Sequence, residues 1–114
     1  MTEFSGENYA ARCDVGAHLV TLSGTLRLNG IAEYAPIVAL LANAAEDATA
    51  MTLDLSALEF LNSSGIAVLS KFVIEARNRG DLALTIIGSG AIPWQGKSLQ
   101  NLRRLMPSLV VEFR

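Results

Sequence analysis

Hydrophobic residues recur along this chain with two different periods, and each period predicts a different kind of element. In 18–28 and 51–60 the apolar residues occupy alternate positions, which is typical of a half-buried strand. In 31–47 they recur every three or four positions, as on one face of a helix. The sequence predicts strands at 9–15, 18–28, 51–60, 82–87 and 110–113, and helices at 31–47, 64–79 and about 98–106.

The resulting element order, β-β-α-β-α-β-α-β, predicts the fold class. Strands that alternate with helices favour an α/β fold, and the opening pair of strands makes the β-sheet mixed, with α-helices covering it. The strand 82–87 is almost continuously apolar, which favours a position covered on both faces. With 114 residues we expect a single domain over 1–114, with its core elements within about 9–113. The expected core residues are Leu53, Leu55, Leu69, Val73, Leu84 and Ile86.

Composition narrows the class of function. The net charge is −2 and no basic run is present, which argues against a nucleic-acid partner. No apolar stretch approaches the roughly 20 residues of a membrane helix, and residues 1–7 lack the features of a secretory signal. We therefore expect a cytoplasmic protein without a membrane partner. Cys13 is the only cysteine, so we expect no disulfide framework and no thiolate metal site. We also expect no cofactor.

The turn between the strand 51–60 and the following helix contains two serines. It reads Asn62-Ser63-Ser64-Gly65, and a helical pattern follows at once. A serine hydroxyl at a helix N-terminus can cap the helix, receive a phosphate or attack a substrate. The turn is therefore the main candidate for a functional site.

The helix after the serines is expected to be amphipathic. At about 100° per residue, one side gathers apolar side chains and the other gathers charged ones. Val68 falls among the charged group, close to Lys71, and is expected to be exposed there. This small apolar patch with a charged rim is either a modest protein-docking surface or a case of scattered surface aliphatics.

The segment 54–69, with the sequence DLSALEFLNSSGIAVL, resembles the signature of STAS domains, the family of sulfate transporters and anti-sigma factor antagonists. The segment 22–26, LSGTL, is similar to the glycine-containing second strand of that family. The resemblance covers about residues 9 to 113 and implies a STAS-like fold. It also implies the function of a stand-alone, bacterial anti-sigma factor antagonist.

In such proteins the first serine of the pair is phosphorylated, and by resemblance this residue is Ser63. The unphosphorylated form binds an anti-sigma factor that is also a serine kinase, or a similar switch protein. The phosphorylated form releases it, and a PP2C-type phosphatase resets the serine. The residues expected to contact the partner or to shape the contacting turn are Asn62, Ser64, Gly65, Val68 and Lys71.

This chain departs from the family pattern at two places. Asn62 stands where aspartate is usual, which keeps the capping ability but removes a carboxylate. The residues after Gly24 are Thr25-Leu26-Arg27, where an acidic residue, leucine and aspartate are common, so the docking surface is less acidic. Two alternatives stay open: serines that only cap the helix, and a nucleotide- or small-molecule-sensing module built from the loops around Asn62 and Gly88.

Enzymatic readings find little support in the sequence. The loop 90–98 resembles a P-loop, but five residues separate its glycines where four are required, and Pro93 removes an amide. We expect instead a turn at 96–98 in which Ser98 caps the last helix, and Trp94 either packs over the core or contacts a partner. His18, expected in a strand, is the only histidine that could activate a serine, and the G-x-S-x-G elbow is absent. We therefore expect no catalytic activity.

Overall fold

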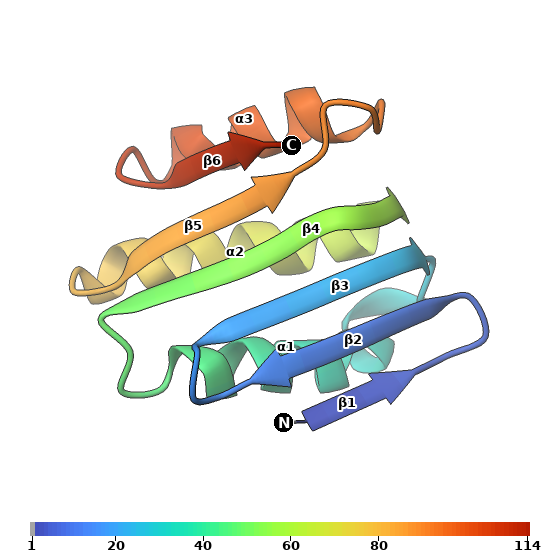
Figure 1. The fold of residues 1–114 in the computed structure, drawn as a ribbon, viewed down its shortest axis with the longest axis horizontal. Helices are drawn as coiled ribbons and strands as arrows, with labels where there is room; N and C mark the ends of the chain where they lie inside the picture. The colour runs from blue at the N-terminus through green and yellow to red at the C-terminus, as the bar shows by residue number, and fades with distance from the viewer. Residues whose placement is uncertain (1) are drawn as a thin grey trace.

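One mixed sheet of six strands organises the chain, and its strands lie in sequence order, β1-β2-β3-β4-β5-β6 (Figure 1). The computed structural model describes residues 2–114. The strands are β1 Thr2–Ser5, β2 Tyr9–Asp14, β3 Leu19–Leu26, β4 Ala50–Leu61, β5 Ala83–Gly88 and β6 Val110–Phe113. The helices are α1 Gly30–Ala45, α2 Ser63–Arg79 and α3 Gln95–Leu105.

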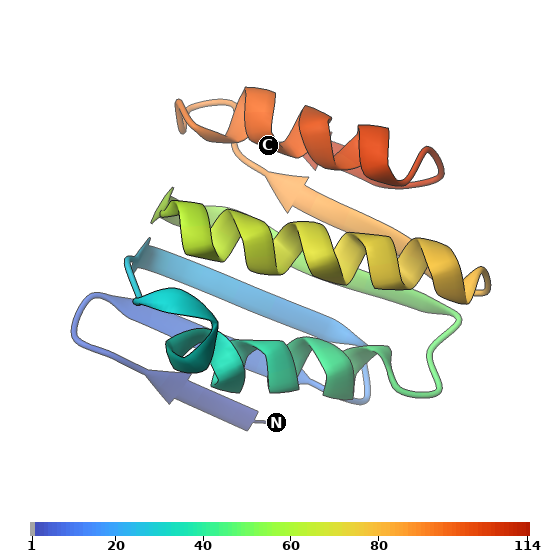
Figure 2. The ribbon, with the colours of Figure 1, turned by 180° about the vertical axis from the view of Figure 1, so that it is seen from behind.

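The first three strands pair in antiparallel fashion, and β3 to β6 pair in parallel. Each parallel connection carries one helix, and all three helices lie on the same face of the sheet (Figures 1 and 2). The predicted α/β class with a mixed sheet is confirmed. The expectation that β5 is covered on both faces is wrong, because no helix of residues 2–114 lies on its other face.

The strand β1 was not predicted, because Phe4 is its only large apolar residue and gives no visible period. It forms by pairing with β2, where Glu3 lies opposite Arg12 and their side chains form an ion pair at 3.1 Å. The Phe4 ring also packs edge-on against Tyr9, with ring centroids 6.3 Å apart. Such cross-strand pairs are what hold an edge strand whose own pattern is weak.

The core lies between the sheet and the helices. All six residues expected there, Leu53, Leu55, Leu69, Val73, Leu84 and Ile86, are buried. The alternation in β4 places Met51, Leu53 and Leu55 on the helix-covered face, as a period of two requires. Each helix follows the carboxyl end of one of the parallel strands, so the N-termini of the helices lie at that end of the sheet.

Two local expectations are wrong. His18 lies before β3 in a turn, with φ of 49°, rather than in a strand. The last helix begins at Gln95, so residues 96–98 are helical and Ser98 does not cap it. Among residues 2–114, no helix is both long and apolar enough to cross a membrane.

Candidate functional site

The serine turn lies where the parallel strands β3 and β4 end. The backbone amide of Asn62 donates to the carbonyl of Leu26 at 3.1 Å, which joins the ends of the two strands. Because Asn62 is in an extended conformation and Ser63 is already helical, the chain changes from strand to helix within one residue. The turn is therefore held at the edge of the sheet by the strand pairing itself.

Asn62 holds the turn through all of its polar side-chain atoms. Its Oδ1 accepts from the backbone amide of Gly65 at 3.0 Å and from the hydroxyl of Tyr34 at 2.7 Å. Its Nδ2 donates to the carbonyl of Leu28 at 2.8 Å. Asn62 is therefore the N-cap of α2 and also ties that helix to α1 and to the loop before α1. The reading in which one of the two serines caps the helix is wrong.

Gly65 allows α1 and the end of β4 to approach the first turn of α2. A Cβ atom at this position would lie 2.2 Å from Cδ1 of Leu61 and 2.7 Å from the hydroxyl of Tyr34. Any side chain at residue 65 would therefore push the turn away from the tyrosine that bonds Asn62. Gly65 shapes the turn, as expected, but it is buried.

Ser63 is the exposed member of the serine pair, whereas Ser64 is half-buried. The hydroxyl of Ser63 makes no hydrogen bond to any other residue within 2–114. Its backbone amide and that of Ser64 belong to the first helical turn, whose N–H groups have no partner within the helix. No acidic side chain lies in that turn. The arrangement therefore offers an accessible hydroxyl in a positive local field.

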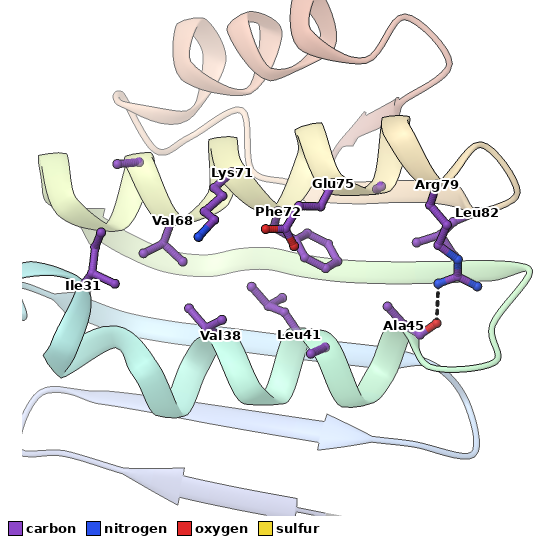
Figure 3. Close-up of a pocket in the computed structure, with 13 residues that line it drawn as sticks. Ile31, Val38, Leu41, Ala45, Val68, Lys71, Phe72, Glu75, Arg79 and Leu82 are labelled. Carbon is purple, nitrogen blue, oxygen red and sulfur yellow. Dashed lines mark hydrogen bonds between the residues drawn. The ribbon is translucent and has the colours of Figure 1, made fainter.

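Two exposed apolar side chains lie near this end of the sheet. Phe60, on β4, is 38% exposed, and the guanidinium of Arg27 lies over its ring at 4.6 Å from the centroid. Ile31, in the first turn of α1, is 69% exposed and faces the start of α2 (Figure 3). Large exposed apolar residues of this kind are enriched where proteins bind one another.

Val68 is not the exposed residue that the helical projection predicted. It is only 7% exposed, because α1 packs against that side of α2. Val68 and Lys71 instead line a groove between the two helices, here called the α1–α2 groove (Figure 3). The residues lining it are Ile31, Val38, Leu41, Ala42, Ala45, Ala67, Val68, Lys71, Phe72, Glu75, Ala76, Arg79 and Leu82.

The other candidate residues have structural contacts. Trp94 donates its indole Nε1–H to the carbonyl of Leu58 at 3.2 Å and packs against the core. His18 donates its Nδ1–H to the carbonyl of Ala44 at 2.9 Å. At Gly88 a Cβ atom would lie 2.7 Å from Cδ1 of Leu99 and 2.8 Å from Oε1 of Gln95, so side chains cover the backbone at this residue. Within residues 2–114 no group of three His, Cys, Asp or Glu residues could hold a metal.

Sequence reasoning missed Tyr34 and Gln95, two buried residues whose side chains form hydrogen bonds to residues far away in the sequence. Tyr34 falls on the apolar stripe of α1, and its hydroxyl reaches Asn62 only in the folded chain. Gln95 is fully buried and bonds the carbonyls of Leu55 and Leu58 at 2.7 and 3.0 Å. The only local sign of such a hydrogen bond is a polar residue at a position expected to lie in the core. That sign does not identify the hydrogen-bond partner.

The family model of the STAS domain matches residues 15–90, a stretch that includes the serine turn and the helix α2. The chain belongs to the STAS domain family. The resemblance drawn from 54–69 is therefore confirmed. Among curated proteins, no sequence matches this STAS chain significantly.

Solved structures share the fold of this STAS chain. A chain from the crystal structure of the diguanylate cyclase SiaD in complex with its activator SiaC from Pseudomonas aeruginosa matches with a TM-score of 0.75 and 15% identity, covering 100% of both chains. SiaC of Pseudomonas aeruginosa matches with a TM-score of 0.72 and 17% identity, covering 100% of this chain and 98% of that one. An anti-sigma factor antagonist from Mycobacterium paratuberculosis matches with a TM-score of 0.59 and 22% identity, covering 81% of this chain and 74% of that one.

Proposed function

We propose that this STAS protein is a partner-switching signalling protein that binds a regulator or serine kinase and is controlled by phosphorylation of Ser63. Family membership supports the general role, as does the fold shared with an anti-sigma factor antagonist and with SiaC, which is described as the activator of SiaD. The partners are an anti-sigma factor with kinase activity, or a similar switch protein, and a PP2C-type phosphatase, all in a bacterial cytoplasm. The protein itself is not an enzyme.

The exposed, unbonded hydroxyl of Ser63 on the first turn of α2 is the observation that carries this proposal. A kinase can reach this hydroxyl without breaking any hydrogen bond of the fold. Asn62 already caps the helix, so Ser63 is free of the structural task that would compete with phosphorylation. Both facts favour a modification site over a purely structural serine.

The electrostatics of the turn fit a switch that changes binding and leaves the fold intact. A phosphoserine adds about −1.5 to −2 charges at pH 7. At the N-terminus of α2 the unpaired amides and the helix dipole stabilise that charge. A partner that covers Ser63 together with the exposed side chains of Phe60 and Ile31 would instead have to remove water from the phosphate, which costs free energy. Phosphorylation therefore weakens the complex.

The position of His18 supports a role without catalysis. His18 lies before the first residue of β3, whereas the serine turn lies beside the last residue of that strand. Eight residues of strand separate the two ends, about 26 Å. The only histidine of the chain is thus too far away to serve as a base for Ser63.

Partner capture from a native cell lysate with wild type, Ser63→Ala and Ser63→Asp tests the proposal. We expect wild type and Ser63→Ala to retain a shared partner and Ser63→Asp to bind it at least about tenfold more weakly, a loss of about 1.4 kcal/mol. Mass spectrometry of the native protein should find phosphate on Ser63. Ser108→Asp, which adds the same charge at an exposed loop serine, is the matched control and should bind like wild type.

The switch hypothesis is wrong if wild type and the two Ser63 variants hold the same partners equally and no phosphoserine is found at this residue. Circular dichroism must accompany the capture, because Ser63→Asp has to be folded for its weaker binding to be interpreted. An acidic residue at the first helical position is normally stabilising, so we expect the variant to unfold at the same or a higher temperature than wild type.

A further inference from the structure

The α1–α2 groove has the size and lining of a binding site for a small apolar ligand. Its volume is about 300 Å³, at the lower end of ligand pockets in proteins. Leu41, Val68, Ala76 and Leu82 form a buried apolar floor. The wall contributed by α1 carries no charged side chain at all, so every charge at the groove comes from α2.

One end of the groove is closed by Arg79. Its Nη1 donates to the carbonyl of Ala45 at 2.6 Å and its Nη2 to the carbonyl of Ala48 at 2.5 Å. Its Nε forms an ion pair with Asp81 at 2.7 Å. Figure 3 shows this side chain bridging from α2 to the end of α1. The charge of Arg79 is therefore already compensated, and its side chain blocks this end of the groove.

The opposite part of the groove carries a lysine without a partner. Lys71 lies over the groove beside Val68 and forms no ion pair with any residue between 2 and 114 (Figure 3). Glu75 follows one turn later, with its carboxylate between Lys71 and the ring of Phe72, and it forms no ion pair within the same residues (Figure 3). Its carboxylate repels an anion from the middle of the groove and leaves the ammonium of Lys71 as the place where an anion is attracted.

We propose that the α1–α2 groove binds a straight-chain fatty acid of medium length, with its carboxylate at Lys71 and its tail running toward Arg79. Eight residues of helix separate Lys71 from Arg79, about 12 Å, which matches an extended chain of about ten carbon atoms. The apolar floor accepts the tail, and the compensated Arg79 offers no second site for the head group. The site is separate from the phosphorylation of Ser63 and does not depend on it.

Calorimetric titration of the intact chain with decanoate, kept below its micelle concentration, tests this site. We expect saturable binding of one molecule, and two further methylene groups between octanoate and decanoate should tighten it by about tenfold. Lys71→Gln should weaken binding of decanoate by about tenfold, because a charged hydrogen bond is lost. Lys97→Gln is the matched control, since Lys97 is the only other lysine and lies on α3.

A second variant tests the groove itself. Ala42 is exposed on the α1 wall, so Ala42→Trp places a ring in the groove without disturbing the core, and it should abolish binding while the protein stays folded. Ala67→Trp does the same from α2. The proposal fails if decanoate does not bind, or if it binds equally well to both folded tryptophan variants. It also fails if decanol or decylammonium binds wild type as tightly as decanoate. None of these measurements needs a protein partner, so they are independent of the proposed switch.

Discussion

At the scale of single residues, Asn62 explains why this chain departs from the aspartate usual in its family. An aspartate could cap α2 equally well, because the cap uses only an acceptor oxygen. The second side-chain contact is different, since Nδ2 donates to the carbonyl of Leu28 at 2.8 Å. A carboxylate would place an acceptor against an acceptor there. Asparagine is the residue that satisfies both sides of this turn.

Replacing Asn62 should therefore destabilise the protein, and the loss should depend on how many of its hydrogen bonds the new residue can still form. We expect Asn62→Ala to lower the free energy of unfolding by about 2–4 kcal/mol, because the cap is lost and the buried hydroxyl of Tyr34 loses its nearest acceptor. Asn62→Asp should cost about 1–2 kcal/mol, since only the contact to Leu28 is lost. Urea denaturation measures both. Asn43→Ala, at an exposed position on α1, should leave stability almost unchanged; an Asn62→Asp variant as stable as wild type would contradict this account.

Tyr34 makes the same cluster sensitive to high pH. Burial raises the pKa of its phenol above the ordinary value of 10.0. The folded state thus keeps a proton that the unfolded state gives up first, so this contribution to stability is complete below pH 10 and is lost as the pH rises through the higher pKa of the folded protein. We expect wild type to be more stable than Tyr34→Phe at pH 7 and pH 9 by the same amount, about 1 kcal/mol. This difference should shrink at pH 11. A difference that stays constant from pH 7 to pH 11 would show that the phenol does not titrate in this way.

At the scale of elements, the sequence predicted what is local and missed what depends on distant contacts. The end of α2 is local: Gly80 adopts the left-handed conformation of a helix C-cap, with φ of 80°, and the predicted stop at Arg79 is confirmed. The start of α3 is not local, because Gln95 is held by carbonyls of β4. Glycine and serine in 96–98 suggested a turn, and tertiary hydrogen bonds made this stretch helical instead.

The candidate site shows the same division. The exposed hydroxyl of Ser63 follows from a strand that runs directly into a helix, which the residue pattern makes visible. The burial of Val68 does not follow from its own helix, because the projection of α2 cannot show on which side α1 packs. For the same reason the α1–α2 groove could not be predicted, since its two walls are separated by more than twenty residues of sequence.

A pair of glycines in two helices tests how far close packing overrides helix propensity. Alanine is normally better than glycine in a helix by about 1 kcal/mol. At Gly65 the added methyl group would lie 2.2 Å from Leu61, so we expect Gly65→Ala to lower stability by about 2 kcal/mol or more. At Gly96 nothing lies within 4 Å of the added atom, so Gly96→Ala should raise stability by up to about 1 kcal/mol. The thermal unfolding temperatures of both variants test this comparison. Equal changes in the two variants would show that close packing at Gly65 does not override helix propensity.

At the scale of the whole molecule, the functional features gather on one side and at one edge. The three helices cover a single face of the sheet, and the serine turn lies at the edge where the parallel strands β3 and β4 end (Figure 2). The α1–α2 groove begins within two helical turns of Ser63 on the helical face. The contacts that stabilise the fold therefore lie within the sheet and beneath the helices. The serine turn lies apart from them, at an accessible end of the sheet.

The remaining helix, α3, is joined to the centre of this arrangement by Gln95. The side-chain Oε1 of Gln95 accepts a hydrogen bond from the backbone amide of Ser89 at 2.7 Å, and its Nε2 donates to two backbone carbonyls of the central strand β4.

Gln95→Leu would leave these buried backbone groups without their partner, so we expect it to lower the free energy of unfolding by about 2–4 kcal/mol. Because the contacts reach β4, hydrogen exchange of the β4 amides should accelerate together with those of α3. Gln100→Leu, on the exposed side of the same helix, should change neither. Faster exchange confined to α3 would mean that this helix opens alone and that the domain is not one cooperative unit.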